Sequence, residues 1–172
     1  MASLIEVLID TLEKEISEYA TLLDLSKTKT PVIVAGEVEK LQKITDEEQK
    51  VVDRLILLDT KRAEAMADIA DVMNRDVKTL KLSHLVDMLS KRPKERDELS
   101  LLHDRLKATV GELKMINDQN RELIRQSLDI VDFKLNLIKS QRSAPETGNY
   151  TSSADISGSS LGGPSGGFDA KQ

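Results

Sequence analysis

Apolar residues recur along the first part of the chain at spacings of three and four, the period of a helix that buries one side. The first such segment covers about residues 3–29 and ends at Thr30-Pro31, because the residue before a proline is pushed out of the helical backbone region. An apolar turn, residues 32–34, follows it. The second segment covers about residues 37–74 without an internal Gly or Pro. The third covers about residues 93–141 and starts at a proline, a favourable first helical residue.

A short helix is predicted between the second and third segments. Ser83 is placed to cap it, and residues 84–91 would form it with Leu85, Met88 and Leu89 facing inward. Long amphipathic helices with short connections predict an all-α fold, a long antiparallel helical hairpin or three-helix bundle of coiled-coil character. Because the lengths differ, we expect the first helix to cover its neighbours only where the second begins and the third finishes. The short helix would close the opposite end.

The glycines divide the chain into two parts. Only Gly36 and Gly111 precede residue 142, and the other six lie after it with seven serines and two prolines. Such a stretch buries too little apolar surface to offset its ordering entropy. We therefore predict a helical domain over residues 1–142 and a flexible Ser/Gly-rich tail over residues 143–172. Large apolar groups of the tail, such as Tyr150, either dock when a partner arrives, cover a groove when none is present, or stay disordered.

Composition excludes several classes of function. The chain has no Cys, so it holds no disulfide, thiolate metal site or Cys nucleophile. Its net charge is -5 and only 2% of its residues are aromatic, which argues against nucleic acid as a partner. No apolar run approaches the roughly 18 residues of a membrane span, and the acidic N-terminus is unlike a secretory signal. We expect a cytoplasmic protein without stable membrane insertion.

The residues that carry chemistry are few. His84 and His103 fit no metal-binding spacing, and the glycines form no phosphate-binding loop. The acidic run 46–48 is typical of a solvated helix face with Glu48 against its neighbours, and the basic run 91–96 is offset by nearby carboxylates. We predict that the chain is not an enzyme and needs no cofactor or metal.

The end of the third long helix carries two apolar faces when it is projected at 100° per residue. The first continues the stripe that starts at Leu99, and consists of Ile124, Leu128, Val131, Leu135 and Ile138. The second consists of Leu123, Ile130, Phe133 and Leu137. A helix with two apolar faces needs two neighbours. Either the first helix covers the second face, or a helix from another protein docks there.

Two asparagines interrupt the apolar stripe of the same helix. Asn117 and Asn120 lie just before the two-faced region. A polar residue in an apolar seam between helices lowers stability and tends to fix the register of the helices. The alternative is a polar contact with the backbone of a partner.

Three stretches of the sequence resemble the FlgN family of bacterial flagellar export chaperones. They are residues 15–23 (EISEYATLL), residues 33–41 (IVAGEVEKL) with Glu47-Glu48-Gln49 and the region of Arg62, and residues 113–128 (LKMINDQNRELIRQSL). The last contains the family's Asn-x-x-Asn, Leu-Ile and Ser-Leu pattern. In the tail, Tyr150 fits a family tyrosine, whereas residues 151–163 are only loosely similar.

The resemblance implies a cytoplasmic chaperone that binds the C-terminal amphipathic helix of hook–filament junction (hook-associated) proteins. It would prevent premature assembly and deliver its clients to the flagellar type III export apparatus. We expect the client helix on the second face, with Ile124, Leu128 and Val131 beside it and Tyr150 from the tail. Two alternatives stay open: a coiled-coil adaptor or scaffold that self-associates, even weakly, and a helical-bundle enzyme or metal carrier.

Overall fold

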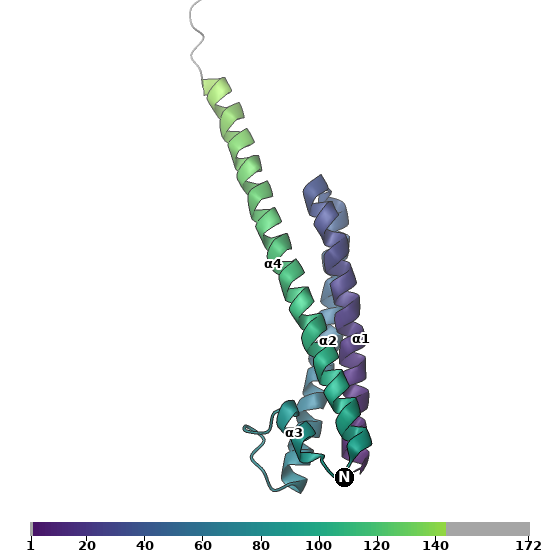
Figure 1. Ribbon diagram of the computed structural model, residues 1–172. Coiled ribbons are helices and arrows are strands. Elements are labelled where there is room, and N and C mark those ends of the chain that lie inside the picture. Colours follow the sequence, from purple (N-terminus) through teal and green to yellow (C-terminus); the bar gives the residue numbers. More distant parts are fainter. Residues whose placement is uncertain (1, 144–172) are drawn as a thin grey trace, which may run out of the picture. The chain divides into compact units, whose positions relative to one another are not determined.

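The computed structural model describes residues 2–143, which are helical apart from their connections (Figure 1). The helices are α1 (Ala2–Ala35), α2 (Val38–Val72), α3 (Leu82–Met88) and α4 (Pro93–Ser143). The predicted all-α class, with three long helices and a short one, is confirmed. Contacts group the chain into two compact units, Met1–Leu135 and Asn136–Gln172. Of the second unit the described part is the end of α4, and the predicted tail with Tyr150 lies outside the described residues.

The predicted end of the first helix at Thr30-Pro31 is wrong, because α1 continues through Pro31 to Ala35. The helix ends at Gly36, whose φ of 67° is the left-handed conformation that glycine adopts without strain. The N–H groups of Gly36 and Glu37 donate to carbonyl oxygens of the last turn at 3.1 Å each, which closes a Schellman motif. Ile33 in that turn is buried, so its packing offsets the hydrogen bond that Pro31 cannot donate.

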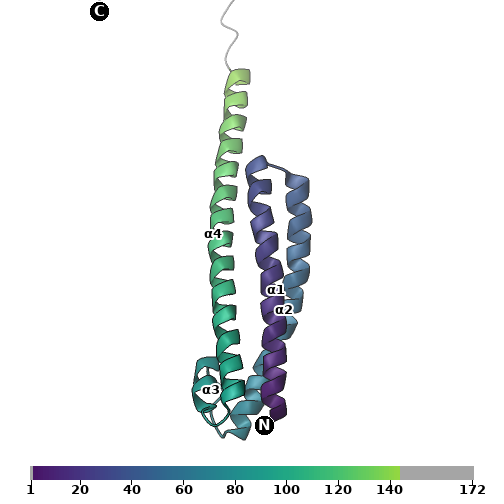
Figure 2. The same ribbon diagram turned by 45° about the vertical axis from the view of Figure 1, so that its right-hand side comes forward.

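The longer α1 changes the expected packing of the helices. With 34 and 35 residues, α1 and α2 match in length and lie antiparallel, side by side (Figure 2). Leu8 and Leu12 near the start of α1 join a core cluster with Leu99 and Leu102 at the start of α4. The expectation that the first helix covers the finish of the last one is therefore wrong. It packs on the beginning of α4 instead.

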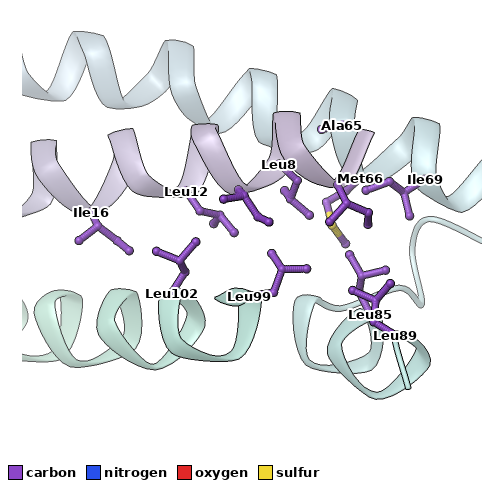
Figure 3. Close-up of a cluster of buried hydrophobic side chains, with 12 residues drawn as sticks. Leu8, Leu12, Ile16, Ala65, Met66, Ile69, Leu85, Leu89, Leu99 and Leu102 are labelled. Atoms are coloured by element: carbon purple, nitrogen blue, oxygen red, sulfur yellow. The ribbon is translucent and has the colours of Figure 1, made fainter. Parts of the chain in front are cut away.

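The larger core lies at the end of the hairpin that α3 closes, as predicted (Figure 3). Leu85 is fully buried and Leu89 nearly so, whereas Met88 stays partly exposed. The predicted cap is wrong: α3 begins at Leu82, and Lys81 precedes it without a side-chain cap. Leu82 packs against the core, and this packing favours a helix that begins one residue before Ser83. The core residues are Ile5, Leu8, Ile9, Leu12, Ile16, Ala65, Met66, Ile69, Leu85, Leu89, Leu99 and Leu102.

A smaller core lies farther along the hairpin, and beyond it α4 has little cover. Leu22 and Leu23 of α1, Val51 and Leu55 of α2 and Leu113 of α4 form this cluster. Among the described residues, α4 has no buried side chain after Asn120. The apolar stripe of α4 therefore continues for several turns past the point where it meets α1 and α2.

A partly buried ion pair links α1 to α2. The Glu15 side chain is only 3% exposed, and its Oε1 accepts a hydrogen bond of 3.0 Å from Nε of Arg62. Burial raises the pKa of the Glu15 carboxyl from its ordinary value of 4.5, and the nearby Arg62 guanidinium only partly opposes this. The folded state therefore binds the Glu15 proton more tightly than the unfolded state does.

We expect Glu15→Gln to change how stability depends on pH. A raised folded-state pKa contributes stability that is complete below about pH 4.5 and is lost as pH rises through the pKa of the folded state. Glutamine is neutral at every pH and lacks this contribution. The free energy of unfolding of the wild type minus that of Glu15→Gln should be larger at pH 4 than at pH 7, measured by urea denaturation. A difference that stays constant over this range would contradict the assignment.

Candidate functional site

The distal part of α4 presents large apolar side chains to solvent. On the first face Leu128 is 59% exposed, and on the second face Phe133 is 68% exposed. Ile124, Ile130 and Val131 are also exposed. Soluble proteins rarely leave neighbouring apolar side chains uncovered, and where they do the patch usually marks an interaction site. This surface is therefore the candidate functional site of the described chain.

The first face lines an apolar groove of about 260 Å³. Ile124, Leu128 and Val131 form one wall, and the α1–α2 turn, from Val32 to Leu41, forms the other. Val32, Ile33, Val38 and Leu41 were not predicted as site residues. The sequence did show the apolar turn next to Gly36. Because the first helix was predicted to end near residue 29, however, nothing indicated that this turn lies against α4.

The structure separates the two predicted faces rather than merging them in one groove. Ile130 and Phe133 do not line the groove, and Leu123 is only partly exposed. Because α1 packs on the beginning of α4, it leaves Ile130 and Phe133 exposed and is not the cover of the second face. Leu137, in the second compact unit, is itself 47% exposed.

A charged strip accompanies these apolar faces along α4. Arg125 donates to the Glu122 carboxylate at 2.7 and 3.0 Å and to Asp129 at 3.4 Å. The hydrogen bonds from Arg125, and next from Gln126, lower the pKa of the Glu122 carboxyl to about 2. Glu122 and Arg125 are both charged at neutral pH, so the apolar faces are bordered by a polar surface that suits an amphipathic partner.

The asparagines predicted in the seam lie between α4 and α1. Asn120 is buried, its Nδ2 donates to the Ser26 carbonyl oxygen at 2.8 Å, and its Oδ1 accepts from the Thr30 hydroxyl at 2.7 Å. Oδ1 of Asn117 accepts from the Ser26 hydroxyl at 3.0 Å. The same hydroxyl contacts Glu48 of α2, which pairs with Lys29. These contacts favour register control over a role in partner binding.

We expect Asn120→Ala to lower the free energy of unfolding by about 2 kcal/mol, because it leaves buried polar groups of α1 without their partner. Urea denaturation measures the effect. The matched control is Asn136→Ala, an exposed asparagine of α4, which should change stability by less than about 0.5 kcal/mol. Equal effects of the two substitutions would argue against a structural role for Asn120.

Residues 2–143 hold neither a metal-binding cluster nor a membrane-spanning helix. No cluster of three His, Asp or Glu side chains there is arranged to hold a metal ion. No helix in this described part combines the length and the apolar character needed to cross a membrane.

A comparison with known protein families shows to which family the chain belongs. The sequence model of a family described as FlgN protein matches residues 1–158. The chain belongs to the FlgN family. The resemblance seen in three stretches of the sequence is thus confirmed over nearly the whole chain. FlgN membership supports a role in flagellum assembly as an export chaperone, and FlgN is a chaperone family rather than a known enzyme family.

One relative adds a second comparison. YvyG of Bacillus subtilis (strain 168), itself described as uncharacterized, is 24% identical over 151 residues. The similarity covers 88% of each chain, so it extends over the helical hairpin and α4 together. No solved structure matches this FlgN-family chain.

Proposed function

We propose that this chain binds the C-terminal amphipathic helix of hook–filament junction proteins on the distal part of α4. In the bacterial cytoplasm, it keeps these helices from assembling prematurely and delivers the proteins to the flagellar type III export apparatus. Membership in the FlgN family supports the chaperone role. The observation that carries the binding site is the uncovered apolar surface of α4 after Asn120.

The groove suits a helical client. Ile124, Leu128 and Val131 follow one another at spacings of four and three, so they present a continuous ridge along α4. A client helix laid between this ridge and the α1–α2 turn would bury its own apolar face, the usual mode of helix-in-groove recognition. Burying one large apolar side chain contributes about 1.5–3 kcal/mol, so several such contacts on both helices are needed to offset the cost of association and reach micromolar binding.

The second face of α4 needs a contact beyond those in the groove. Ile130 and Phe133 stay outside the groove, so a single client helix in the groove does not cover them. We propose that the client covers them too, together with Leu123. Leu137, which belongs to the second unit, remains a predicted client contact. Tyr150, which lies outside the described residues, remains a predicted contact from the tail.

Calorimetric titration of the full chain tests this function. The titrants are synthetic C-terminal helices of the hook–filament junction proteins from the same organism. We expect one-to-one binding at micromolar or lower Kd with a negative heat-capacity change, the signature of apolar burial. Failure of every such peptide to bind would contradict the proposal. Light scattering on the chain alone then separates a scaffold, which forms a tight dimer without client, from a monomer.

A further inference from the structure

The α3 end of the hairpin is basic in a chain that is acidic as a whole. Between Met73 and Glu98 there are seven Lys and Arg against five Asp and Glu, a local charge of +2 in a chain of net charge -5. Like charges gathered at one end set up a local field that attracts partners of opposite sign. The client surface proposed above lies at the other end of the hairpin, beside the α1–α2 turn.

An apolar hollow of about 320 Å³ lies within this basic end. Ile5, Leu85 and Leu89 line it with the side chains of Met73 and Met88. Methionine side chains are flexible and polarizable, so they adapt to an incoming apolar group. Lys91 and Arg92 also line the hollow and surround its apolar floor with positive charge.

The expected neutralisation of the basic run 91–96 by nearby carboxylates is only partial, because Arg96 pairs with Asp97 at 2.7 Å while other described cations at this end have no such partner. Among the described residues Lys91, Lys81 and Lys78 form no ion pair, and Arg92 reaches only Glu95, at 3.7 Å. The loop before α3 repeats the arrangement, since Val77, Leu80 and Lys81 line a second hollow of about 390 Å³. Two apolar hollows at this end of the hairpin are therefore each bordered by positive charge.

We infer that the hollow beside Lys91 and Arg92 is a docking site for an acidic, amphipathic protein segment that is distinct from the client. Its carboxylates would pair with the two cations, and one large apolar side chain would enter the hollow. Charge complementarity of this kind speeds association and selects the partner, while the apolar anchor supplies affinity. The site would let the chain hold a second protein at the α3 end while the distal part of α4 is occupied.

A protein segment fits this site better than an anionic membrane does. A membrane surface is engaged by apolar groups that protrude from the protein. Here Ile5 is 1% exposed and Leu85 is fully buried, so the apolar floor is recessed and the partner must insert a side chain into it. A peptide side chain reaches such a floor, whereas a flat lipid surface does not.

The probe is a labelled synthetic peptide of about 20 residues with Leu on one helical face and Glu on the other. Fluorescence anisotropy with the full chain measures its affinity, and a second peptide carries Gln in place of each Glu. We expect micromolar binding of the Glu peptide that weakens as salt is added, and much weaker binding of the Gln peptide. Equal binding of both peptides would overturn the inference.

Charge reversal locates the probe on the chain. Lys91→Glu with Arg92→Glu should weaken binding of the Glu peptide about tenfold. The matched control is Lys107→Glu with Lys114→Glu, two exposed lysines of α4 whose reversal changes the net charge by the same amount. The control should leave the affinity within about twofold. Equal weakening by both pairs would show attraction to net charge alone and overturn the site.

Two further measurements separate this site from its alternatives. Ile130→Asp with Phe133→Asp disrupts the second face of the proposed client surface, and Leu128→Asp disrupts its groove. Both variants should leave the Glu peptide bound as before; loss of binding in either would place the probe on the client surface. Vesicles of phosphatidylcholine and phosphatidylglycerol should not bind in a way that depends on Lys91 and Arg92. Vesicle binding that does so, without peptide binding, would replace the protein segment with a lipid surface.

Discussion

Ile130→Asp combined with Phe133→Asp should weaken binding of the client helix at least about a hundredfold, or about 2.7 kcal/mol. The two side chains are 54% and 68% exposed, so the free chain has little packing to lose. In the complex, each aspartate would be a carboxylate covered by apolar surface without a partner, which costs several kcal/mol unless the contact opens. Calorimetry with the client peptide measures the loss.

The matched control lies on α2. Ile56 and Leu57 are 59% and 65% exposed, close to the values at the test positions. Ile56→Asp with Leu57→Asp adds the same charge and removes a similar apolar area, yet it should leave client affinity unchanged. Circular dichroism and urea denaturation should show that both double variants are folded. A folded Ile130→Asp, Phe133→Asp variant that binds the client normally would show that the second face is not part of the site.

Leu99→Ala should lower the free energy of unfolding by about 3 kcal/mol, while Leu128→Ala should change it by less than about 0.5 kcal/mol. Both leucines lie on the same apolar stripe of α4. Leu99 is fully buried in the larger core and would leave a cavity, whereas Leu128 is 59% exposed. Urea denaturation of the two single variants measures the contrast.

The effects of the two substitutions on client binding should be the reverse of their effects on stability. Leu128 lines the groove, so Leu128→Ala should weaken client binding, and a folded Leu99→Ala variant should bind almost normally. Equal losses of stability for the two substitutions would mean that the distal part of α4 is packed against the rest of the chain. The uncovered surface on which the proposed function depends would then not exist.

Much of the fold could be predicted from spacing alone. The three-and-four rhythm located α2 and α4 to within a few residues, because long amphipathic helices repeat their signal many times. The errors fell at helix ends, where tertiary packing outweighs local preference. Burial of Ile33 carries α1 past Pro31, and packing of Leu82 starts α3 ahead of Ser83. Neither contact is visible in a window of neighbouring residues.

The candidate site was only partly predictable for a related reason. Periodicity tells which residues of α4 share a face, but it does not tell which part of that face has a neighbour. Leu99 and Leu128 are equivalent in the pattern and opposite in exposure. The wall of the groove at Val38 and Leu41 depends on where α1 ends, so the error at Pro31 hid it.

The proposed client helix lies on α4 beyond Asn120 and against the α1–α2 turn. Amide hydrogen exchange of the full chain with and without a bound junction-protein helix tests it most directly. We expect slower exchange over residues 121–135 of α4 and over residues 32–41 when the client is bound, with the middle of α2 unchanged. Protection confined to α2 or to the α3 end, with these two segments unaffected, would contradict it.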